Sequence, residues 1–338
     1  VNVLIDLTTV TTSMTVNQLR GRSLRLDNDA PQKLSDNWDI VCLAPEFTKG
    51  LDDYKRFLAK HEKLYGVTDD GAIEKGVGHV HAAFTELRPE GIEDNVDRLN
   101  TEMLQRVGQR AAMRERWKIG EPYRGQPQRT VEARVMANRE RNRRGFPPFA
   151  RSRNPWTEHS LAQAIGQAIA EALFEAKLLK SRPQLHTSDR AGGYTRLFLE
   201  RADQDDNALF ATSLQEALAP LDLQPRYLIP RDIVRVEPTW IGQRTGNMIP
   251  SWLRPRLPDA LTKLLEKRTR ERAMWHAVPS SLAKNKELVE IYQKHWNRHV
   301  SPGKAIYGLR EEGDRILATA RAEGLSPSGS VHEKDVFF

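Results

Sequence analysis

The chain has 338 residues, of which 39% are hydrophobic and 29% charged, a balance typical of a globular protein with its own core. Its length allows two domains at about 150 residues each. No stretch approaches the roughly 20 apolar residues of a membrane-spanning helix, so we expect no membrane partner. The single cysteine, Cys42, excludes an internal disulfide and a CxxC zinc site, and favours a reducing, cytoplasmic location.

The net charge of +7 is unevenly distributed along the chain. Between Leu104 and Asn154, fourteen Lys and Arg stand against four Glu, which gives +10 there and leaves −3 on the rest. A basic segment on a nearly neutral body indicates a polyanionic partner such as nucleic acid. The alternative is a solvated helix face. The densest part of the segment, which we predict to contact phosphates, is Arg139, Arg141, Arg143 and Arg144.

The first elements follow the order of an α/β protein. The nearly continuous apolar run at Val1–Leu7 predicts a strand buried on both faces of a parallel sheet. A Thr-rich loop follows, and then a predicted helix at Val16–Leu26, a buried strand at Asn37–Ala44 that includes Cys42, and a helix at Asp52–Leu64. This is too short for a whole doubly wound domain, so we expect further strand–helix units to precede Val1.

The rest of the chain predicts a helical, Arg-rich segment and then an α+β region. A helix is expected at Asn95–Glu115, and Pro147 and Pro148 interrupt any helix before the next region. The later predicted elements are helix Thr157–Leu179, strand Tyr194–Arg201, helix Ala208–Leu218, strand Pro225–Pro230, strand Arg272–Val278, helix Ser281–Trp296, strand Lys304–Leu309 and helix Glu311–Glu323. Two β-α-β units in tandem favour a ferredoxin-like sandwich.

The run QLRGRSLR, at residues 18–25, carries the clearest chemistry. Arg22 and Arg25 are three residues apart, so they share one face of a helix. Guanidinium groups held in this way can clamp phosphate oxygens, and an arginine that reaches a γ-phosphate stabilises the charge on the transferring group. Gly21 allows a close approach of the backbone to a ligand.

This run resembles motif VI of superfamily 2 helicases, the DEAD/DEAH-like group. The motif consists of Gln, two variable positions, Gly-Arg, two variable positions and Arg, and Gln18, Gly21, Arg22 and Arg25 match it in order and spacing. The preceding residues, VNVLIDLTTVTTSMTVN, are similar to the strand and loop that lead from motif V into motif VI. The resemblance is confined to the beginning of the chain.

The resemblance implies that Arg22 and Arg25 are arginine fingers for ATP and Mg²⁺ held mainly by another RecA-like domain. It implies that Gln18 couples the nucleotide to the interface between the two motor domains. Further residues that it puts near the cleft or the nucleic-acid strand are Asp6, Gly21, Thr11 and Thr12. Nucleic acid is then the expected partner, with DNA favoured over RNA.

The chain also departs from a complete motor, because it has no GxxxxGK[ST] phosphate loop and no acidic run for Mg²⁺. We therefore expect the missing N-terminal RecA-like domain of the same polypeptide to be a partner beside nucleic acid, and no ATP hydrolysis by this chain alone. The predicted regions are the C-terminal part of the second RecA-like domain (1–90), a basic helical connector (91–155), an accessory α+β domain (156–324) and a tail (325–338).

Two other hypotheses remain open. The chain could be a non-catalytic module that binds nucleic acid or protein through its basic segment, or an unrelated α/β enzyme. No metal site is predicted, because His79 and His81 lack a third ligand at typical spacing. His276 has no neighbouring nucleophile or acid pair in the sequence, so we expect it to be structural.

Overall fold

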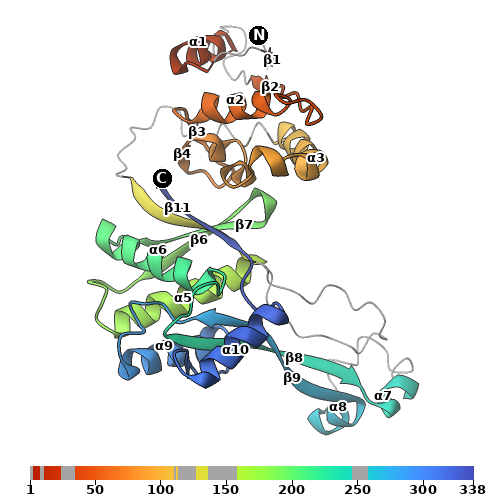
Figure 1. The fold of residues 1–338 in the computed structure, drawn as a ribbon, viewed down its shortest axis with the longest axis vertical. Helices are drawn as coiled ribbons and strands as arrows, with labels where there is room; N and C mark the ends of the chain where they lie inside the picture. The colour runs from red at the N-terminus through yellow and green to blue at the C-terminus, as the bar shows by residue number, and fades with distance from the viewer. Residues whose placement is uncertain are drawn as a thin grey trace. The chain divides into compact units, whose positions relative to one another are not determined.

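The computed structural model describes residues 3–7, 11–23, 35–109, 112, 127–135, 158–245 and 258–338 (Figure 1). Within these ranges the fold is mixed α/β, with both parallel and antiparallel strand pairs. The chain divides into two compact units. The first unit comprises residues 1–129, 188–194 and 334–338, and the second comprises 130–187 and 195–333.

The first unit begins with a parallel β-α-β arrangement and continues with a small antiparallel sheet. Its elements are β1 (Val3–Asp6), α1 (Ser13–Ser23), β2 (Asp36–Asp39), α2 (Asp52–His61), β3 (Tyr65–Val67), β4 (Ile73–Lys75) and α3 (Val96–Val107), with short 3-10 turns at 77–79, 82–85, 89–91 and 93–95. The end of β11 (Ser330–Phe337) extends this sheet, because Val336 pairs antiparallel with Glu74.

Apolar side chains from α2 and α3 form the core of the first unit. Tyr54 and Phe57 lie three residues apart on α2 and pack in one cluster with Leu99 of α3. The side chain of Arg190, fully buried, bonds to Asp69 and Glu74 at 2.8 Å each. These ion pairs join segments that are more than 100 residues apart in the sequence.

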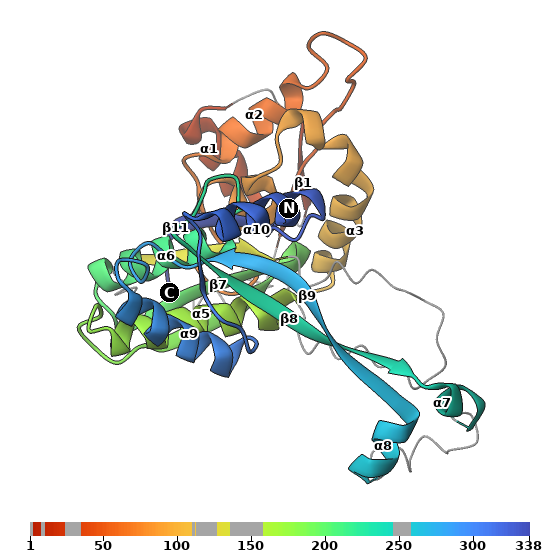
Figure 2. The same cartoon turned by 60° about the horizontal axis from the view of Figure 1, so that its bottom comes forward.

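The second unit contains two sheets and the helices that cover them. Its elements are β5 (Gln128–Arg134), α5 (Glu158–Glu175), β6 (Gln184–Arg190), β7 (Tyr194–Glu200), α6 (Gln204–Leu218), β8 (Tyr227–Pro238), α7 (Trp240–Thr245), α8 (Asp259–Leu265), β9 (Glu266–Ala277), α9 (Lys286–His299), β10 (Ile306–Tyr307) and α10 (Glu311–Ala322); the ends of β5, β6, β7 and β11 belong to the first unit. The strand orders are β11-β5-β7-β6 and β10-β8-β9. Strands β8 and β9 form a long antiparallel ribbon with α7 and α8 at its far end (Figure 2).

Helix α5 is central to the core of the second unit. It is rich in alanine, a strong helix former, and Leu161, Ile165 and Ile169 along it are fully buried. Helices α6 and α9 pack in the same core, and both begin with side-chain caps: Asp203 accepts from the Asp206 amide, and Asn285 from the Leu288 amide. No helix in the described ranges is both long enough and apolar enough to cross a membrane.

The predicted ferredoxin-like sandwich is wrong. It requires the strands of the two β-α-β units to share one sheet, but β7 lies in a sheet with β5, β6 and β11, whereas β8 pairs with β9 and β10. Both units were predicted from element order along the chain, and that order does not determine which strands pair.

Several local expectations also differ from the structure. The expected tail at 325–338 contains strand β11, and the expected helical connector contains strand β5. Strand β2 ends at Asp39, so Cys42 lies in a loop and is exposed rather than buried. Strand β1 is not buried on both faces, because it pairs only with β2 among the described strands, and Val3 and Ile5 are 48% and 59% exposed.

The buried His276 should make the second unit less stable in acid. Burial, assisted by the nearby charge of Arg231, lowers the pKa of His276 to about 3, against a hydrogen bond to the Ala217 carbonyl that favours the charged form. The unfolded chain takes up this proton near pH 6.5, so stability should be full above about pH 6.5 and should fall toward pH 3, by up to about 1.4 kcal/mol per pH unit.

Urea unfolding followed by tryptophan fluorescence at about pH 7 and about pH 5 measures this loss. The His276→Gln variant should show a smaller difference between the two pH values, whereas His186→Gln, which changes a partly exposed histidine, should keep the wild-type difference. An equal pH dependence in the wild type and His276→Gln would contradict the assignment.

Candidate functional site

The candidate site is built on the parallel pair β1 and β2 and the helix between them. The register joins Val3 to Asp36 and Asp6 to Asp39, so both strands end at the same edge with an aspartate. A parallel pair needs a crossover connection, and α1 lies in that connection. In open α/β sheets, ligands bind beyond the carboxyl ends of the strands.

Lys60 of α2 connects the two strand ends. Its ammonium group donates to Asp6 Oδ2 at 2.5 Å and to a carboxylate oxygen of Asp39. The Lys60, Asp6 and Asp39 side chains are only 7%, 9% and 16% exposed. Parallel pairing forces two carboxylates together, and this ammonium offsets their repulsion at a site with little access to water.

Arg20 of α1 also belongs to this network. Its Nη2 lies 3.8 Å from Asp39 Oδ2 and 2.7 Å from His61 Nε2. Since a guanidinium can only donate, His61 accepts at Nε2 and donates through Nδ1 to the Phe57 carbonyl at 2.9 Å. Burial and the positive charge of Arg20 lower the pKa of His61, against the Phe57 bond and the negative charge of Asp39, so the ring is held neutral.

Helix α1 therefore has two different faces. Val16, Arg20 and Ser23, spaced by four and three residues, form the inner face: Val16 and Ser23 are buried, and Arg20 is half-buried. Ser23 Oγ lies 2.7 Å from Asn37 Oδ1, which ties the end of the helix to β2. A cavity of about 1160 Å³, lined by Arg20 and His61 and by aromatic rings of α2, lies on this inner side.

The outer face carries the residues that the motif predicts. Gln18, Gly21 and Arg22 are all exposed, and none of them lines the cavity. Within the described parts of the chain, Gln18 and Arg22 make no side-chain hydrogen bond or ion pair. A Cβ added at Gly21 would meet nothing within 4 Å, so internal packing gives no reason for a glycine there, although glycine costs a helix about 1 kcal/mol relative to alanine.

The other predicted residues fall into three groups. Thr11 and Thr12 are exposed just before α1, with Thr12 Oγ1 donating to Thr15 at 2.9 Å. Asp6 is engaged by Lys60, and little of it reaches solvent. The remaining predicted residues lie outside the described ranges: Arg25, Arg139, Arg141, Arg143 and Arg144.

Sequence reasoning missed Arg20, Asp39, Lys60 and His61. Asp39 gave only a weak signal, because it precedes the apolar run Ile40–Ala44, whereas Asp6 follows the apolar residues Val3–Ile5. Lys60 gave no comparable signal, since a lysine on a surface helix is normally solvated. His79 and His81, the two histidines weighed as a metal pair, have different hydrogen-bond partners. His81 is fully buried and bonds to Glu102 at 2.5 Å, whereas His79 bonds to the Gly76 carbonyl at 2.6 Å.

The chain matches no protein-family model, no curated protein and no solved structure.

Replacing Lys60 should strongly destabilise the first unit. Lys60→Met removes the ammonium group that bridges two largely buried carboxylates, which should cost about 3–5 kcal/mol in the free energy of unfolding. Urea unfolding measures this loss. The matched control is Lys55→Met on the same helix, whose ion pair with Asp52 is 58% and 37% exposed and should cost less than about 1 kcal/mol.

The combined variant Lys60→Met, Asp6→Asn, Asp39→Asn tests the reason for that loss. It removes the charges together, so it should recover a large part of the lost stability. Two results together would contradict this role of the ion-pair network: no recovery of the unfolding free energy in the combined variant, and a loss for Lys60→Met no larger than the loss for Lys55→Met.

Proposed function

We propose that this chain is the C-terminal part of a superfamily 2 nucleic-acid helicase or translocase. In this proposal residues 1–90 complete a second RecA-like domain, and the rest is a connector and an accessory α+β region that grips nucleic acid, DNA in preference to RNA. A cytoplasmic location fits this function. The observation that carries the proposal is that Gln18, Gly21 and Arg22 share the exposed face of α1, the helix that connects two parallel strands.

The state of Arg22 is what an arginine finger requires. Its guanidinium is exposed and makes no internal ion pair with the described residues, so its donors are available to an external phosphate. Arg20, only two residues away, is not available in this way, because Asp39 and His61 engage it. The motif position is therefore Arg22, the arginine that is not part of the ion-pair network of Lys60, Asp6, Asp39 and Arg20.

The exposed apolar residues of the N-terminal sheet support a larger RecA-like domain. Val3 and Ile5 of β1 are 48% and 59% exposed, which is unusual for the apolar positions of a parallel sheet, and Ile40, just after β2, is 52% exposed. Additional strands and helices from the same polypeptide would cover these residues.

The mechanism divides the work between two domains. ATP with Mg²⁺ would be held mainly by the other RecA-like domain, and the γ-phosphate would face the outer side of α1. Arg22, together with Arg25, would stabilise the negative charge that develops on the transferring phosphoryl group. Gln18 would couple the bound nucleotide to the interface between the two motor domains. Gly21 would let the helix backbone approach the nucleotide closely. Loss of these contacts after ATP hydrolysis would let the two motor domains separate and the nucleic-acid strand move by a step.

Removing the finger should abolish ATP turnover without unfolding the protein. In the polypeptide that includes the other motor domain, Arg22→Ala or Arg25→Ala should lower nucleic-acid-stimulated ATP hydrolysis by about a thousandfold or more and spare nucleic-acid binding. Because Arg22 has no partner among the residues that the structure describes, Arg22→Ala should change the unfolding free energy of this chain by no more than about 0.5 kcal/mol.

The matched control is Arg98→Ala, which removes a partly exposed arginine of α3 that pairs with Glu102. It should leave ATP turnover near the wild-type rate. Unchanged turnover in both Arg22→Ala and Arg25→Ala would overturn the arginine-finger assignment.

Nucleic-acid binding by this chain alone separates the accessory-grip proposal from a plain interaction module. Fluorescence anisotropy with labelled single-stranded and duplex DNA and RNA should show binding that weakens steeply with salt, because phosphate contacts release counterions. Replacing Arg139, Arg141, Arg143 and Arg144 with Ala should reduce both the affinity and the salt dependence. No binding at low salt would leave the basic segment as a solvated or protein-docking surface.

A further inference from the structure

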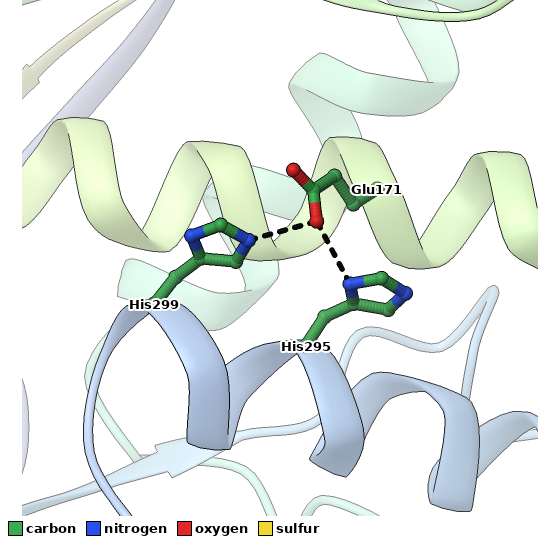
Figure 3. A group of neighbouring side chains, drawn as sticks. All are labelled: Glu171, His295 and His299. Carbon is green, nitrogen blue, oxygen red and sulfur yellow. Dashed lines mark hydrogen bonds and ion pairs between the residues drawn. The ribbon is translucent and has the colours of Figure 1, made fainter.

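The second unit contains a cluster of histidine and glutamate side chains, residue types that can ligate a metal ion. The cluster is separate from the candidate site at α1, which belongs to the first unit. Glu171 of α5 and His295 and His299 of α9 meet between the two helices (Figure 3). Glu171 Oε2 lies 3.0 Å from His295 Nδ1 and 2.8 Å from His299 Nε2. These three ligand atoms all lie within 4.8 Å of one another.

Helix geometry explains why the three side chains converge. His295 and His299 are four residues apart, so they occupy neighbouring positions on one face of α9. Trp296 and Tyr292 of the same helix are fully buried in the core shared with α5, which holds the two helices in contact. The histidine face of α9 therefore lies against the Glu171 side of α5.

Other residues orient the three ligand atoms. Glu175, one turn after Glu171, lies 2.8 Å from His295 Nε2, and Lys294 in turn bonds to both oxygens of Glu175 at 2.8 Å. A carboxylate on the second ring nitrogen is the usual support of a metal-binding histidine, because it fixes the ring and leaves the first nitrogen as the ligand.

Glu171 is likewise held in place by a neighbouring side chain. Gln167 donates to its Oε1 at 2.9 Å, which leaves Oε2 directed at the two imidazoles. The side chains of Glu171, His295 and His299 are 26%, 8% and 20% exposed, so the cluster is accessible from solvent without being fully hydrated.

We propose that Glu171, His295 and His299 bind a divalent transition-metal ion, with Zn²⁺ as the expected occupant. Two histidines and one carboxylate form a common ligand set for zinc, at bond lengths of about 2.0–2.2 Å. A tetrahedron of that size separates its ligand atoms by about 3.3 Å. The observed 2.8 and 3.0 Å contacts of Glu171 would widen by a few tenths of an ångström, and the two imidazole nitrogens, which lie within 4.8 Å of each other, would adopt the same separation. Water would complete the coordination.

The bound ion would cross-link α5 and α9 and stabilise the folded second unit, since it binds the folded state in preference to the unfolded chain. This role is independent of the proposed helicase function. The sequence contained half of the signal, a His-x-x-x-His spacing in HWNRH, but Glu171 lies 124 residues before His295 and only the packing of the helices brings it close.

The competing explanation is a protein-only network, in which a doubly protonated His295 bridges Glu171 and Glu175. The two explanations differ in their response to metal. We expect one equivalent of Co²⁺ to give the visible absorption of a low-symmetry, nearly tetrahedral site, and Zn²⁺ to displace Co²⁺ and to raise the thermal unfolding midpoint. EDTA should reverse both effects. A purely ionic network would show none of them.

Variants of the proposed ligands, of Glu175 and of one control histidine complete the test of zinc binding. His299→Gln and Glu171→Gln should each weaken Zn²⁺ binding by at least about tenfold, and Glu175→Gln, which keeps all three ligands, should weaken it by about 10- to 100-fold. The control is His186→Gln, because His186 forms a similar 2.8 Å contact with Glu200 on neighbouring strands but has no third ligand among the described residues.

Circular dichroism establishes that each variant is folded before metal is added. Unchanged Zn²⁺ affinity in His299→Gln and Glu171→Gln, or less than about one tenth of an equivalent of Co²⁺ bound by the wild type, would overturn the proposal. If one variant fails to fold, the wild-type titration and the Glu175→Gln variant still decide the question.

Discussion

The N-terminal part of the first unit depends on one electrostatic constraint, the meeting of two carboxylates at the ends of parallel strands. The pairing of β1 with β2 puts Asp6 beside Asp39 where little water can screen them. Lys60 offsets this repulsion, and Arg20 adds a second positive charge near Asp39. Because Arg20 is used in this way, it also orients α1, so that the opposite face of the helix, with Arg22, is left to solvent.

In the second unit, helix α5 serves two purposes that place opposite demands on its surface. Its apolar positions, such as Ile165 and Ile169, fill the core with residues of α6 and α9. Near its C-terminal end, Glu171 and Glu175 turn toward the polar side of α9 and meet His295 and His299. A metal site at this point would link the two helices where their packing passes from core to surface.

Much of the secondary structure followed from local patterns, and the errors concern contacts over long distances. The helices beginning at Asp52, Lys286 and Glu311 lie within or close to their predicted ranges, because apolar spacing and capping residues are local. The ferredoxin-like pairing was wrong because strand order within a sheet depends on contacts between distant segments. Strand β11 was missed for the same reason: its partner Glu74 is more than 250 residues away.

The sequence by itself determined that Gln18, Gly21 and Arg22 lie on one face of a helix after a strand, since helical spacing alone decides which residues are neighbours. The motif singled out Arg22 but gave no role to Arg20, which has the same side chain two positions earlier. Only the tertiary structure decided that Arg20 faces Asp39 and His61 while Arg22 faces solvent. The same holds for Glu171, His295 and His299: the i, i+4 spacing of the histidines is local, whereas their carboxylate partner is supplied by the packing of α5 against α9.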